Sequence, residues 1–199
     1  MDKTVYVMVC DIMENCSESN STLVRIDRTA PTGLTVRGFK KENADNVKAA
    51  TGLEMIENNT WHNGWVLVVP RGASDTGSGD LSYLLTVTGA SENIDDGLQG
   101  YRNINAEGIS YVSFKACDKV GNCSSAVEFV VKLDRTGPTA PEIVNSSGEQ
   151  WTKDSVTLTI RNSKDTGSTI GNYYYSYIEN PVEYGSTPDS KWVLIEDGK

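Results

Sequence analysis

Hydrophobic and polar residues alternate over two neighbouring stretches of the chain, residues 112–116 and 127–133. Every second position there is apolar, namely Val112, Phe114, Ala116, Val127, Phe129, Val131 and Leu133. A period of two residues is typical of β-strands with one buried face. Asp118, Gly121 and Asn122 lie between the stretches and favour a turn, because glycine tolerates positive φ and the other two bond to their own backbone. The pattern predicts a β-hairpin.

The same arrangement occurs near the N-terminus. Five residues recur in order about 107 residues later: Cys10, Asp11, Asn15, Cys16 and Ser17 match Cys117, Asp118, Asn122, Cys123 and Ser124. The Asp-Arg-Thr of residues 27–29 recurs at residues 134–136. A match of this length indicates tandem domains. We therefore predict a second hairpin, with Val5, Val7, Val9, Val24 and Ile26 on its core side.

The two cysteines of each hairpin lie six positions apart across the predicted turn. Facing strands bring Cβ atoms within the range of a disulfide bond. We predict the pairs Cys10–Cys16 and Cys117–Cys123, each pinning the register of its hairpin. The alternative is a Cys₄ zinc site, although the spacing differs from the usual two to four residues.

The repeated segments define the predicted domain organisation. Pro31 and Pro138 follow the Asp-Arg-Thr segments and mark short, stiff connectors, because proline fixes φ and lacks a backbone donor. We predict the last hairpin of one domain at 1–28, a complete domain at 29–135, and the first strands of another domain at 136–199.

A second set of matching residues begins at Trp61 and Trp151 and has an offset of only about 90 residues. It pairs Tyr83, Leu85 and Val87 with Tyr173, Tyr175 and Tyr177. The shorter offset places an insertion in the complete domain, near 37–60, with a short helix expected at residues 46–50.

Composition narrows the class of protein. The chain has 18 basic and 27 acidic residues and a net charge of −9, which argues against nucleic acid and anionic membranes as partners. No apolar run is long enough to span a bilayer, so we expect no membrane insertion. Paired cysteines favour an oxidising compartment, and we expect the protein to be extracellular, on a cell surface or secreted.

These motifs resemble the bacterial immunoglobulin-like (Big-type) repeats of cell-surface proteins and adhesins. The resemblance rests on the Asp-Arg-Thr-x-Pro-Thr connectors, on Trp61 and Trp151, on the Asp-x-Gly-Ser turns, and above all on the hairpin from Ala116 to Ser124. The first copy departs from this hairpin at residues 12–14. The resemblance implies an all-β chain of tandem Ig-like sandwiches of seven strands each.

Asp-Thr-Gly-Ser occurs twice, at Asp75 and at Asp165. In pepsin-like aspartic proteases two such motifs share one proton across a catalytic pair. Those motifs are flanked by apolar strands, whereas residues 71–74 and 161–164 are largely polar, and the two copies belong to different predicted domains. We interpret both as turns and keep an aspartic peptidase as a remote alternative.

Exposed aromatic residues are candidates for binding sugar rings. Tyr174 lies within a run of tyrosines, and Trp192 lies near the end of the chain. The competing interpretation places alternate tyrosines, Tyr173, Tyr175 and Tyr177, in the core, because tyrosine favours strands. Tyr174 must then be exposed for the sugar-binding interpretation to hold.

Candidate metal and catalytic residues are few. His62 is the single histidine, and neither a catalytic nor a zinc role is expected for it. Four aspartates near predicted domain ends are weighed as Ca²⁺ ligands, Asp11, Asp27, Asp118 and Asp134, against a simpler role in turns and connectors. We predict no metal and no cofactor.

The predicted function is non-enzymatic, as a structural spacer or adhesive segment of a bacterial surface protein. Its expected partners are neighbouring Ig-like domains of the same chain and a host or cell-wall glycan or protein. The alternative is a carbohydrate-binding accessory module of a secreted glycan-active enzyme. Because residues 1–28 form a closing hairpin and 136–199 lack one, we also hypothesise head-to-tail complementation between molecules.

Overall fold

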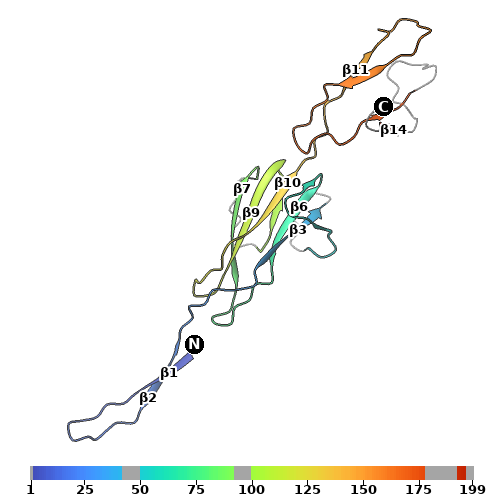
Figure 1. Cartoon of the computed structure of the whole chain (residues 1–199). Coiled ribbons are helices and arrows are strands. Elements are labelled where there is room, and N and C mark those ends of the chain that lie inside the picture. The colour runs from blue at the N-terminus through green and yellow to red at the C-terminus, as the bar shows by residue number, and fades with distance from the viewer. Residues whose placement is uncertain (1, 42–49, 92–99, 178–191, 196–199) are drawn as a thin grey trace. The chain divides into compact units, whose positions relative to one another are not determined.

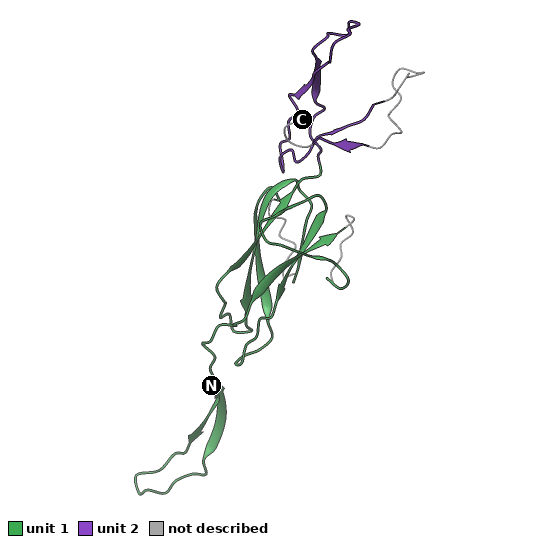
Figure 2. Ribbon diagram, turned by 45° about the vertical axis from the view of Figure 1, so that its right-hand side comes forward, with its two compact units in different colours: residues 1–135 green, residues 136–199 purple. Residues whose placement is uncertain are grey.

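The computed structural model describes residues 2–41, 50–91, 100–177 and 192–195 (Figure 1). Within these ranges the protein is all-β, as predicted, and contains no helix. It divides into two compact units, residues 1–135 and 136–199 (Figure 2). Most of the expected short helix, residues 46–49, lies outside the described residues. The described part of the chain has no helix of the length and apolarity that a bilayer span requires.

The described residues of unit 1 include two four-stranded sheets. One has the order β4-β3-β6-β8, with β3 at Thr35–Lys41, β4 at Met55–Ile56, β6 at Trp65–Arg71 and β8 at Arg102–Ile104. The other has the order β5-β10-β9-β7, with β5 at Trp61–His62, β7 at Ser82–Gly89, β9 at Gly108–Cys117 and β10 at Val127–Leu133. All pairs are antiparallel except β5 with β10, which are parallel.

The two sheets face each other across one hydrophobic core. It combines side chains of both sheets: Ile56, Val66, Val68, Val87, Ile104, Val112, Phe114, Phe129, Val131 and Leu133. Phe114 is fully buried, and Val112 and Ala116 lie on the same side of β9. The alternation predicted for β9 and β10 is confirmed, because a strand directs successive side chains to opposite faces of its sheet.

Strand β6 is buried on both faces. Val66 and Val68 point into the main core, whereas Leu67 and Val69 pack with Ala50 in a second, smaller cluster. Phe39, Leu53 and Tyr101 pack against this cluster from its margin. Part of the segment predicted as an insertion, at Ala50 and Leu53, therefore covers the outer face of this sheet.

A separate hairpin precedes the sandwich in unit 1. Its strands β1 (Asp2–Val7) and β2 (Asn20–Arg25) form the predicted antiparallel pair. Every residue of both strands is exposed, so the expected core side of this hairpin is wrong. Among the described residues, β1 and β2 form a sheet of two strands without a facing layer. Alternation in a sequence predicts which side chains share a face, but burial requires a second layer.

In the described part of unit 2, residues 136–177 and 192–195, there are two pairs of antiparallel strands. β11 (Glu142–Asn145) pairs with β12 (Leu158–Arg161), and β13 (Tyr174–Tyr175) pairs with β14 (Val193–Leu194). The first pair has the register of β3 with β6: Glu142 faces Arg161 as Thr35 faces Arg71.

Burial in unit 2 differs from the expectation. Tyr173, Tyr175 and Tyr177 were expected in the core, as alternate strand positions, yet all three are exposed. Val87 of unit 1, which corresponds to Tyr177, is buried because β9 and β10 complete the sandwich around it. In the described part of unit 2, β13 has only β14 as a neighbour.

Candidate functional site

The turn between β9 and β10 is held by one aspartate. Asp118 Oδ1 accepts hydrogen bonds from the N–H groups of Val120 (3.0 Å) and Asn122 (2.8 Å). The side-chain amide of Asn122 donates to Asp118 Oδ2 at 2.7 Å. Gly121 has φ of 94°, a conformation that glycine adopts without steric cost. The disulfide Cys117–Cys123 closes the base of the turn.

The turn between β1 and β2 repeats this pattern. Asp11 Oδ1 accepts from the N–H groups of Met13 (2.9 Å) and Asn15 (2.8 Å), and the Asn15 amide donates to Asp11 Oδ2 at 2.9 Å. Glu14 replaces the glycine and has φ of 68°. The turn therefore keeps its geometry despite the different residues 12–14, with one non-glycine residue in the left-handed region.

Both predicted disulfides, Cys10–Cys16 and Cys117–Cys123, are present. All four cysteines of the chain are used in these bonds, so the alternative Cys₄ zinc site is excluded.

The connector after β2 is fastened to two loops of unit 1. Asp27 Oδ2 accepts a hydrogen bond of 2.6 Å from the N–H of Ser78, in the loop between β6 and β7. The backbone carbonyl of Asp27 accepts one of 3.3 Å from the side-chain amide of Asn122, in the β9–β10 turn. Asp27 Oδ1 accepts from the N–H of Thr29 at 3.0 Å. One residue thus joins the connector to both loops.

The first Asp-Thr-Gly-Ser motif forms the loop that receives Asp27. Asp75 Oδ2 accepts from the N–H groups of Gly77 (3.0 Å) and Gly79 (2.9 Å), which is the turn chemistry expected for this motif. Gly77 lies so close to Asp27 that an added Cβ would overlap the Asp27 carboxylate. Only glycine admits this close approach.

The second Asp-Thr-Gly-Ser motif belongs to the other unit. Asp165 Oδ1 accepts from the N–H of Gly167 at 3.5 Å, which is again a local contact within a turn. Asp75 and Asp165 lie in units 1 and 2, respectively.

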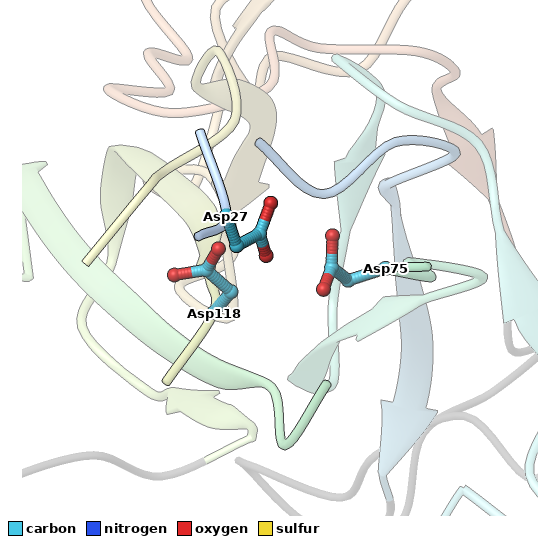
Figure 3. A group of neighbouring side chains, drawn as sticks. All are labelled: Asp27, Asp75 and Asp118. Carbon is cyan, nitrogen blue, oxygen red and sulfur yellow. The ribbon is translucent and has the colours of Figure 1, made fainter. Parts of the chain in front are cut away.

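Three carboxylates meet where the connector contacts the two loops. Asp27, Asp75 and Asp118 each offer an oxygen within 4.8 Å of the other two (Figure 3). Asp118 is 5% exposed, and Asp75 Oδ1 is buried without a hydrogen-bond partner. Ca²⁺ binds carboxylate oxygens but takes six to eight ligands, so three aspartates would supply part of a coordination shell and backbone carbonyls or water the rest.

Hydrogen bonds favour the ionised forms of Asp27 and Asp118. Backbone N–H groups of Thr29 and Ser78 lower the pKa of Asp27. Burial raises the pKa of Asp118, but hydrogen bonds from Asn122, Ser78 and Val120 together hold the pKa below its ordinary value. Asp27 and Asp118 therefore favour the charged form that a cation would bind.

The cluster contains two of the four aspartates weighed as Ca²⁺ ligands. Asp27 and Asp118 belong to it, whereas Asp11 caps the first turn and the N–H of Asp134 bonds to the carbonyl of His62. Sequence reasoning missed Asp75 as a candidate metal ligand, because it interpreted this residue as part of a turn, with a peptidase role as a remote alternative. The repeated Asp-Thr-Gly-Ser motif marked Asp75 as a residue of interest. Its proximity to Asp27, however, depends on how the connector folds back onto the loop.

The aromatic candidates lie in unit 2. Tyr174 and Trp192 are 53% and 57% exposed and line one groove with Pro138, Pro141 and Ile170. Trp61 belongs to unit 1, where the ammonium group of Lys132 lies 6.0 Å from its ring centroid. His62 ends β5, and its Nε2 lies 2.8 Å from Thr60 Oγ1.

Comparison of the chain with family models, curated proteins and solved structures found no match.

Proposed function

We propose that this chain is a non-enzymatic structural segment of tandem Ig-like domains from an extracellular bacterial surface protein. In this proposal it acts as a spacer or adhesive stalk whose first partners are neighbouring domains of the same chain. The two-sheet sandwich of unit 1 and the two disulfides support the proposal, since disulfides persist in oxidising compartments. A host or cell-wall glycan or protein is the expected external partner.

The observation that carries the proposal is the attachment of the connector through Asp27. Its side chain and its backbone carbonyl bind different loops of unit 1. Two attachments on one residue restrict rotation about the connector backbone, which a freely jointed linker would allow. A spacer needs this restriction because flexible joints shorten the mean distance between its ends.

The proposal is tested with the substitution Asp27→Ala. We expect the backbone amides of β1 and β2 to reorient independently of unit 1 in the variant, with a shorter rotational correlation time by ¹⁵N relaxation. Arg28→Ala is the matched control, because Arg28 is the exposed neighbour of Asp27. Equal correlation times in the native protein and in Asp27→Ala would contradict an ordered connector.

A second candidate function is carbohydrate binding by unit 2. The groove that contains Tyr174 and Trp192 favours it, because exposed aromatic rings stack on the apolar faces of sugars. A glycan array with the intact chain tests it directly, alongside the double variant Tyr174→Ala, Trp192→Ala. Specific binding that is lost in the double variant would replace the spacer proposal with carbohydrate recognition.

A further inference from the structure

A lysine is buried on the outer face of the sheet β4-β3-β6-β8. Lys41, the last residue of β3, is only 2% exposed, although lysine is almost never fully buried without a specific partner. Its side-chain nitrogen, Nζ, lies 2.9 Å from Oδ1 of Asn103 in β8. A primary amine is thus held against a side-chain carboxamide inside unit 1. Neither side chain has a part in the proposed function.

The strand register places both side chains on the same face of the sheet. Phe39 is two residues from Lys41 in β3, so these two side chains share a face. Phe39 lies opposite Leu67 across the β3–β6 pair, and Leu67 lies opposite Asn103 across the β6–β8 pair. Residues directly opposite each other in antiparallel strands also share a face. The lysine side chain therefore crosses β6 to contact the asparagine.

The outer face around this pair is apolar. Its buried cluster and the side chains packed against it comprise Leu67, Val69, Ala50, Phe39, Leu53 and Tyr101. Little water reaches Lys41 in these surroundings, while Asn103 is half-buried. Burial favours the neutral form of an amine over its charged form, and the neutral amine is the nucleophile.

The distance between the two groups permits a direct reaction. Cγ of Asn103 is bonded to Oδ1 at about 1.2 Å, so it lies no more than about 4.1 Å from Nζ of Lys41. Reacting atoms fixed at about 3–3.5 Å have effective concentrations of about 10⁵ M or more. The reaction has to occur only once in each chain, so a slow rate is sufficient.

We propose that Lys41 and Asn103 form an intramolecular isopeptide bond. The neutral amine of Lys41 attacks Cγ of Asn103, and the Nζ–Cγ bond forms as the Cγ–Nδ2 bond breaks. One proton of the amine passes to Nδ2, which leaves as ammonia. Nothing is oxidised or reduced, so the reaction needs no redox partner. Loss of ammonia to the solvent makes the bond permanent.

The isopeptide bond ties β3 to β8 across the intervening strand β6. Its two residues are 62 positions apart, so tension on the chain cannot extend the segment between them. Like a disulfide, such a cross-link restricts the unfolded chain, but thiol reductants do not cleave it. Both residues belong to unit 1, so the bond does not depend on the proposed function.

The mass of the intact chain tests the bond. After denaturation and reduction of both disulfides, we expect the native protein to be lighter than its sequence by one molecule of ammonia. Proteolytic digestion should release a branched peptide that contains both Lys41 and Asn103, identified by tandem mass spectrometry. A chain with the full mass of its sequence would overturn the proposal and leave only a hydrogen bond between the two side chains.

Three variants assign the loss of ammonia to this pair. Lys41→Arg should have the full mass, because a guanidinium keeps the charge and the hydrogen-bond donors but stays protonated and is not nucleophilic. Asn103→Ala should also have the full mass, because it lacks the carboxamide. Lys40→Arg, at the neighbouring exposed position, is the matched control and should keep the loss. A loss that persists in Lys41→Arg would assign it to another reaction, such as succinimide formation at Asn63-Gly64, and would refute the proposal.

Discussion

The two hairpins of this chain have the same local structure and opposite surroundings. Each contains an aspartate that caps its turn, a disulfide at its base and the same strand register. β9 and β10 form part of a sandwich core, whereas β1 and β2 are exposed along their whole length. The comparison teaches that short-range sequence specifies the hairpin and that its stability depends on the layer packed against it.

The largest expected difference in the free energy of unfolding is between substitutions at Phe114 and at Val7, which are equivalent apolar positions of the two hairpins. Phe114→Ala removes a fully buried ring and should lower the free energy of unfolding of unit 1 by about 4 kcal/mol. Val7→Ala changes a side chain that is 61% exposed and should alter it by less than about 0.5 kcal/mol. Urea denaturation followed by tryptophan fluorescence measures both. Similar losses in the two variants would mean that β1–β2 is packed in solution.

Removal of each disulfide should affect the two hairpins differently. Replacing Cys117 and Cys123 by alanine should destabilise unit 1 by about 2 kcal/mol, the loop-closure value for so short a loop. Replacing Cys10 and Cys16 should speed hydrogen exchange in β1 and β2 and leave the denaturation midpoint of unit 1 unchanged. A shift of that midpoint in the second variant would contradict the independence of the first hairpin.

The two turns have different residues, Glu14 and Gly121, at the equivalent position with positive φ. Gly121→Glu should destabilise unit 1 by about 1 kcal/mol, and Glu14→Gly should stabilise the first hairpin by about the same amount, because the left-handed conformation is costly for residues with a Cβ. A Cβ at Gly121 meets no atom within 4 Å, so the cost is conformational rather than steric. Denaturation and hydrogen exchange report the two changes. An unaffected Gly121→Glu variant would indicate that the turn adopts another conformation.

The smallest expected effect is the pH dependence of the first turn. The side chain and backbone of Asn15, with the backbone of Met13, lower the pKa of Asp11 below its usual 3.8. A lowered pKa stabilises the turn fully above the unfolded value, and this contribution is lost as pH falls through the folded value. The amide shifts of Met13 and Asn15 by NMR should move together on acidification. In Asp11→Asn that common transition should disappear; its persistence would assign the titration to another group.

The sequence predicted features that depend on neighbours along the chain. The strand pairs and turns of the two hairpins and both disulfides follow from alternation and from the spacing of Asp, Asn and Cys. The convergence of Asp27, Asp75 and Asp118 was not predicted, because it depends on a connector that folds back onto two loops. Exposure of Val7 and Tyr175 was not predicted either, because their strands carry the pattern of a sandwich without its second layer.

Native-state hydrogen exchange at two equivalent amides tests the central claim most directly. The N–H of Ser124 donates to the carbonyl of Ala116, and that of Ser17 donates to the carbonyl of Val9, both at 2.8 Å. At concentrations where the chain is monomeric, we expect Ser124 to exchange through global unfolding of unit 1 and Ser17 through faster local opening. Equal protection of the two amides would contradict the claim that packing, rather than the turn and disulfide, sets the stability of each hairpin.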